Sequence, residues 1–155
     1  MRSVYSWLDE YGASHQHGFN KFLHSICVPA IVFSLMGLAW GLAVPETLQF
    51  LSPVFNWAAV LALAALVFYI FLSVRLALGM AVVLAIMLVM VFLIDRLPVP
   101  LWRISIIIFI LAWIGQFIGH LAEGRRPSFF KDLQFLLIGP LWLLAIIYRK
   151  LGIAY

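Results

Sequence analysis

The stretch SICVPAIVFSLMGLAWGLAV, residues 25–44, contains no charged side chain, and Pro45 and Glu46 follow it directly. An α-helix needs about 20 mostly apolar residues to cross the hydrocarbon core of a bilayer. A helix also satisfies its backbone hydrogen bonds internally, as the membrane interior requires. The stretch therefore predicts a membrane-spanning helix.

Four more apolar runs follow the first one. They are residues 54–74, 76–94, 104–122 and 133–148. The tight connection from Ser73 to Gly79 makes the second and third runs an antiparallel hairpin. The last run is shorter and contains Gly139 and Pro140, and because proline removes a backbone donor it predicts a kinked span or a re-entrant segment. The sequence thus predicts an all-α, polytopic membrane bundle of about five transmembrane helices.

The composition agrees with a membrane protein. Hydrophobic residues make up 66% and charged residues 10% of the 155 residues, whereas a soluble domain is roughly half apolar and a quarter charged. A chain of this length is predicted to form one domain, residues 1–155. The net charge of +4 does not indicate a nucleic-acid partner. The basic residues stand singly between apolar runs, as residues that flank membrane spans do.

Two segments outside the apolar runs have an amphipathic pattern. One face of the N-terminal segment consists of Val4, Trp7, Leu8 and Tyr11. Their spacing predicts a short helix that lies in the membrane interface. The segment RRPSFFKDLQF, residues 125–135, has a similar character, and Pro127 favours a helix start there.

The alternation of spans places the connecting segments on two sides of the membrane. With five spans, the N-terminus, the Arg75 turn and the loop after the fourth span share one side. That side carries Arg2, Lys21, Arg75, Arg125, Arg126 and Lys131. The other side carries Arg96, Arg103, Arg149 and Lys150. Since cytoplasmic segments are enriched in Lys and Arg, the first side is predicted to be cytoplasmic.

The histidines all fall at this predicted cytoplasmic side. His15, His17 and His24 precede or begin the first span, and His120 ends the fourth. Because the fourth span runs back to the first side, the four imidazoles can converge. A helix break near Gly18 would let His15 fold back toward His24. For His17 alone, a structural or solvated role is favoured.

Polar residues beside the histidines extend the candidate site. Asn20 is predicted to cap a helix that starts at Lys21. Gln116, His120 and Glu123 are spaced so that one helix face carries all three. Imidazoles with a nearby carboxylate suit iron, zinc, copper or nickel, and such a set with open positions is typical of non-haem iron(II) sites. Since ionisable residues at membrane depth are costly and usually functional, a shared site is favoured.

Arg125 and Arg126 follow this site directly and have two interpretations. They form either an ordinary positive membrane flank or a fork that binds a substrate carboxylate. The many tryptophans are interpreted as interface anchors and packing residues.

Several short motifs resemble one known family. They are His15-x4-Asn20-x3-His24 with SICVP after it, then QFIGH at residues 116–120 and EGRRP at residues 123–127. They resemble motifs of the membrane 2-hydroxy fatty acid dioxygenases over most of the chain. The resemblance implies an iron(II)-dependent membrane enzyme that uses O2 to shorten a long-chain 2-hydroxy fatty acid by one carbon, releasing CO2. It implies the endoplasmic reticulum for a eukaryotic chain and the inner membrane for a bacterial one.

The resemblance also implies roles for single residues. The iron ligands would be His15, His24 and His120, with Asn20 and Gln116 orienting them. Glu123 would be a fourth ligand or a base, and Arg125 and Arg126 would bind the substrate. The alkyl chain would lie between helices, with its carboxylate and 2-hydroxyl group at the metal on the cytoplasmic face.

Two functions of other classes remain open from the residues alone. A haem or electron-transfer membrane protein would use two of the histidines as axial ligands, and a Soret band would reveal it. A non-catalytic membrane protein or small transporter would use the histidines as a proton relay. Such a protein would fold and purify without a metal.

Overall fold

The computed structural model describes residues 2–51, 55–124 and 135–155, and all regular secondary structure in this part of the chain is α-helix. Its helices are α1 (Val4–Ala13), α2 (Gly18–Trp40), α3 (Glu46–Leu51), α4 (Trp57–Leu72), α5 (Val74–Ile94), α6 (Leu101–Ala122) and α8 (Ile138–Lys150). Three of them, α2, α5 and α6, are long and apolar enough to cross a membrane. The all-α membrane bundle is therefore confirmed.

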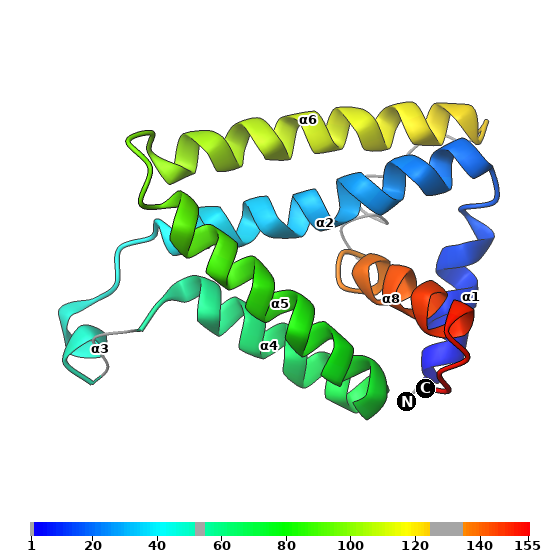
Figure 1. Cartoon of the computed structure of the whole chain (residues 1–155), viewed down its shortest axis with the longest axis horizontal. Coiled ribbons are helices and arrows are strands. Elements are labelled where there is room, and N and C mark those ends of the chain that lie inside the picture. The colour runs from blue at the N-terminus through cyan, green and yellow to red at the C-terminus, as the bar shows by residue number, and fades with distance from the viewer. Residues whose placement is uncertain (1, 52–54, 125–134) are drawn as a thin grey trace.

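The predicted hairpin is formed by α4 and α5, which lie side by side (Figure 1). Ser73 joins them in an extended conformation, which ends α4, and its side chain accepts a hydrogen bond from the Leu76 amide at 3.3 Å. This bond satisfies one of the free donors at the start of α5. With 16 residues, α4 is shorter than the three long helices.

The last apolar run does not form a kinked span, the first of the two structures predicted for it. Its helix, α8, has 13 residues, which at a rise of 1.5 Å per residue is about 20 Å, less than the roughly 30 Å of the hydrocarbon core. Pro140 is the third residue of α8 and lies in the first turn. Amides of the first turn have no partner within the helix, so the proline does not kink it.

The C-terminal residues lie at the same end of the bundle as the N-terminus (Figure 1). The Tyr5 ring stacks on the Tyr155 ring with centroids 5.7 Å apart. At the tip of the α4–α5 hairpin, the Arg75 guanidinium donates to the Ala154 carbonyl at 3.0 Å. The chain thus has its two ends and this turn on one side.

This arrangement corrects the predicted distribution of charge. Arg149 and Lys150 were predicted on the far side, but α8 does not carry them there. The start of α1, the start of α2, the α4–α5 turn and the end of α8 lie at the end that holds the termini, and the α5–α6 connection lies at the other (Figure 1). Among the described residues, the first group of segments carries Arg2, Lys21, Arg75, Arg149 and Lys150, and the α5–α6 connection with the start of α6 carries Arg96 and Arg103. The asymmetry of positive charge is therefore larger than a five-span topology gives.

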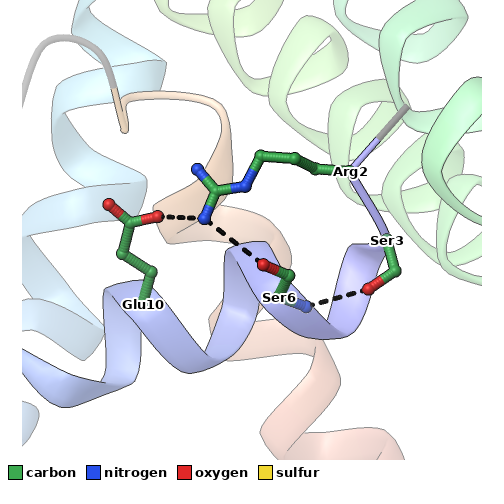
Figure 2. A network of polar contacts seen from close by, with 4 residues as sticks. All are labelled: Arg2, Ser3, Ser6 and Glu10. Carbon is green, nitrogen blue, oxygen red and sulfur yellow. Dashed lines mark hydrogen bonds and ion pairs between the residues drawn. The ribbon is translucent and has the colours of Figure 1, made fainter.

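The N-terminal helix is amphipathic, as predicted. Its buried residues are Val4, Leu8 and Tyr11, and the helix packs against α8. Figure 2 shows its exposed side, where the Ser3 hydroxyl caps the helix by accepting from the Ser6 amide at 3.2 Å. Arg2 donates to the Ser6 hydroxyl and pairs with Glu10. These contacts fix the helix start and leave its apolar face to α8.

The antiparallel helices α2 and α6 approach closely because small residues line their interface (Figure 1). A Cβ atom added to Gly115 would lie 2.5 Å from Cys27 Sγ, and one added to Gly119 would lie 2.5 Å from Asn20 Oδ1. The two glycines are four residues apart, the spacing typical of close helix contacts in membranes. This contact brings the start of α2 to the end of α6.

Candidate metal centre

Three histidines from separate segments meet at this end of the bundle. His15 lies in the link between α1 and α2, His24 in the second turn of α2, and His120 near the end of α6. All three are buried, with 2%, 2% and 6% of their surface exposed. One ring nitrogen of each lies within 4.8 Å of the others, close to the roughly 3–4 Å spread that bonds of about 2.1 Å to a shared ion require.

Backbone hydrogen bonds fix the orientation of two of the rings. His15 Nδ1 lies 2.6 Å from the Tyr11 carbonyl oxygen, and His24 Nδ1 lies 3.1 Å from that of Asn20. A carbonyl only accepts, so each Nδ1 carries the proton and donates. In the neutral imidazole, each Nε2 then offers a lone pair. Histidine ligands of metal sites are usually held in this way.

The two lone pairs point at each other. His15 Nε2 and His24 Nε2 are 2.8 Å apart, and two unprotonated nitrogens at this distance repel unless they share a cation. Burial lowers the pKa of His15 below its ordinary value, because the charged ring is poorly solvated. Neutral imidazole is the form that binds metals. The residues therefore fit a metal ion.

Aromatic side chains complete the surroundings of His15. The Tyr11 ring stacks on the His15 ring with centroids 4.2 Å apart, and the Trp142 ring lies 5.8 Å away. Tyr11 was predicted only as part of an apolar helix face, and Trp142 only as an interface anchor or packing residue. The sequence contains a signal for the contact of Tyr11 with His15, because the two residues are four positions apart. It contains none for Trp142.

The link between α1 and α2 breaks the helix as predicted, but its cap is a different residue. His17 precedes α2 and accepts a hydrogen bond from the Phe19 amide through Nδ1 at 3.3 Å. Asn20, the predicted cap, lies inside the first turn with its side chain directed at Glu123. The ring of His17 performs the capping, and His17 itself is exposed and lies outside the histidine cluster.

Glu123 ends α6 and holds the α1–α2 link. Its carboxylate accepts hydrogen bonds from the Gln16 amide at 2.7 Å, the His17 amide at 3.0 Å and the Asn20 side chain at 2.8 Å. Desolvation raises the pKa of Glu123, but these three hydrogen bonds outweigh it and lower the pKa to about 2. Glu123 is thus an anionic clamp between α6 and the segment that carries His15.

Two buried amides flank the histidines. Gln116, one turn before His120, lines a small cavity of about 20 Å³ together with His24 and Trp113. Asn20 Oδ1 is buried and has no hydrogen-bond partner among the described residues. A buried acceptor of this kind usually serves water, an ion or a ligand. Arg125 and Arg126, the predicted substrate-binding pair, lie outside the described residues.

Comparisons with known proteins agree with the resemblance in the motifs. Residues 1–151 match the family model of 2-hydroxy-palmitic acid dioxygenase Mpo1-like proteins. The chain is 29% identical over 149 residues to 2-hydroxy-palmitic acid dioxygenase MPO1 of Saccharomyces cerevisiae, covering 95% of this chain and 80% of the relative. No solved structure matches it. The match over nearly the whole length shows that this chain belongs to the Mpo1-like family of 2-hydroxy-palmitic acid dioxygenases.

Proposed function

We propose that the protein is an iron(II)-dependent dioxygenase that shortens long-chain 2-hydroxy fatty acids by one carbon. The main support is the cluster of three buried imidazoles, two of which are held by the backbone with Nε2 facing inward. The family assignment supports the substrate class. Imidazole ligands and open coordination positions suit non-haem iron(II).

The overall conversion needs no separate reductant. One 2-hydroxy acid and one O2 give the acid one carbon shorter, CO2 and water, and this equation balances in atoms. The substrate supplies all four electrons that reduce O2, because its α-carbon is oxidised to a carboxyl group and its old carboxyl group leaves as CO2. We therefore expect turnover without a nicotinamide cofactor or a redox partner protein.

The chain's own residues bind and orient the reactants. His15, His24 and His120 would hold the iron, which would supply the redox chemistry that lets O2 react with the acid. Asn20 and Gln116 position the imidazoles and the neighbouring ligands. Glu123 keeps the His15 segment against α6 rather than acting as a base, since its low pKa leaves it a weak proton acceptor.

The surroundings of the site suit an amphiphilic substrate on the cytoplasmic side. Most of the described basic residues lie at the end of the bundle that holds the histidines, as cytoplasmic segments do. Arg125 and Arg126 follow the end of α6, and their positive charge is proposed to attract the anionic substrate to this face of the membrane.

A haem held by His15 and His24 is disfavoured by their geometry. Axial ligands bind from opposite faces of the macrocycle, and nitrogens 2.8 Å apart leave no room for it. This distance suits neighbouring ligands of one small ion.

The test is conversion of a defined substrate. Protein purified without oxygen and loaded with iron(II) is supplied with O2 and 2-hydroxypalmitic acid, and the lipids are measured by mass spectrometry. We expect the acid one carbon shorter, with palmitic acid as a control that reacts much more slowly. No shortened acid, or equal reaction of both acids, would contradict the proposal.

A further inference from the structure

A groove with a volume of about 1,020 Å³ lies beside the histidines. Its walls come from α1, α2, α5 and α8, and His15 is part of its lining. Met80, Val83 and Met87 of α5 form one apolar wall, and Leu143 of α8 faces the same space. The volume lies at the upper end of the roughly 300–1,000 Å³ of small-molecule pockets, so it suits a long alkyl chain.

The charged residues of the groove favour an anionic ligand. They are Asp9, Lys21, Arg149 and Lys150. Arg149 lies seven residues after Trp142, whose ring is 5.8 Å from the His15 ring, and this spacing is about 10 Å along a helix. Asp9 and Arg149 also line a neighbouring cavity together. Of the three cations in the groove, Lys21 is the one nearest in sequence to a histidine of the cluster.

Lys21 stands at the histidine end of the groove. It precedes His24 by three residues, which places the two on one side of α2. No ion pair of Lys21 is present among the described residues. Lys21 and His15 line the same groove. Lys21 is therefore a cation beside His15 in the groove, with no carboxylate partner among the described residues.

We propose that this groove binds the acyl chain of the fatty acid and that Lys21 binds its carboxylate, an assignment that rests on the proposed function. The groove begins at Lys21 and His15, and its lining continues to Pro29 on α2 and Met87 on α5. Both directions lead from the end of the bundle that holds the termini toward its middle (Figure 1). The head group is thus held at the histidines, and the tail points into the membrane.

Photolabelling of the metal-free protein tests the groove without turnover. The probe is a long-chain 2-hydroxy fatty acid with a diazirine in the middle of its chain, and mass spectrometry maps the labelled residues. Label on Val83, Met87 or Leu143 supports the groove. Label confined to the exposed α5 residues Val82 and Ile86 would overturn it.

Matched variants test the two ends of the ligand. Lys21→Gln should raise the probe concentration needed for half-labelling about tenfold, since a charge-assisted bond is lost, whereas Lys21→Arg and the remote Arg103→Gln should not. Val83→Phe should weaken labelling by the long-chain probe about tenfold and spare a shorter one, because the added ring shortens the pocket. Val82→Phe, one residue away, is its control. Unchanged labelling in Lys21→Gln or Val83→Phe would refute the corresponding assignment.

The two proposals fail in different ways. Correct labelling without chain shortening in the iron(II) assay would reject the dioxygenase and keep the groove as a fatty-acid site. Chain shortening with label only outside the groove would reject the groove and keep the enzyme. An Arg125→Ala variant that weakens labelling while Lys21→Gln does not would assign the carboxylate to the arginines and overturn the role of Lys21.

Discussion

Among single residues, the three histidines differ in how they are held in place. His24 and His120 project from long helices, whereas His15 lies in a short link and depends on side-chain support. That support consists of the stacked Tyr11 ring, the Nδ1 hydrogen bond and the Glu123 clamp behind the link. Because the link that carries His15 can open locally more easily than a long helix, His15 is the histidine whose position is most easily lost.

Loss of a histidine should abolish metal retention. His24→Ala and His120→Ala should each lose stoichiometric iron, because two remaining imidazoles hold an ion weakly. Metal analysis after dialysis measures this. His17→Ala serves as the control, since His17 is exposed and only caps α2. Full retention of metal in His120→Ala would show that the centre does not include α6.

The Glu123 clamp should tune metal affinity without being a ligand. Glu123→Gln loses the negative charge that three donors share, so the His15 segment should open more often and the metal should bind about 10–100-fold more weakly. Competition with a chelator of known affinity gives the dissociation constant. Glu10→Gln, which removes an exposed ion pair on α1, should leave it unchanged. An equal effect of both variants would reject the clamp.

Among the helices, the α2–α6 contact decides whether the centre forms at all. Gly119→Ala places a methyl group against Asn20, whose side chain is also tied to Glu123. We expect a loss of about 1–3 kcal/mol of stability together with weaker metal binding. Thermal unfolding in detergent, followed by circular dichroism, measures the first effect. Gly18→Ala is the matched control, because its Cβ meets no atom within 4 Å.

The sequence predicts the long helices well because a bilayer imposes one simple requirement on each of them. Uncharged length identifies α2, α5 and α6, and their alternation brings His24 and His120 to one end. The same criterion fails for α8, which packs against α1 and α5 and has 13 residues, fewer than a span needs. A sequence does not distinguish apolar residues that pack against other helices from apolar residues that face lipid.

The finer geometry of the site depends on contacts between segments far apart in the chain. His17 caps α2, although asparagine is the more favoured capping residue, because the Asn20 side chain donates its hydrogen bond to Glu123 instead. The stacking of Tyr11 on His15 depends on the angle between α1 and α2. The groove needs four helices to form its walls, so no local pattern predicts it.

For the whole molecule, the two ends of the chain should share a side of the membrane. In a Cys27→Ser background, Ser3→Cys and Ala154→Cys should react with an impermeant maleimide from the same side, and Val99→Cys from the opposite one. The contact of Arg75 with Ala154 is the reason. Comparison of right-side-out and inverted vesicles measures this. Labelling of Ala154→Cys together with Val99→Cys would show that α8 crosses the membrane.

The distance in sequence between His15 and His120 has a consequence for folding. An ion bound by both closes a loop of about a hundred residues, and a cross-link over such a length restricts the unfolded chain strongly. The metal would then act as a reversible cross-link between His15 and His120. Ligand linkage predicts about 2.7 kcal/mol of added stability at a free iron concentration one hundred times the dissociation constant. Chelation should therefore lower the unfolding temperature of the wild-type protein and leave that of His120→Ala unchanged.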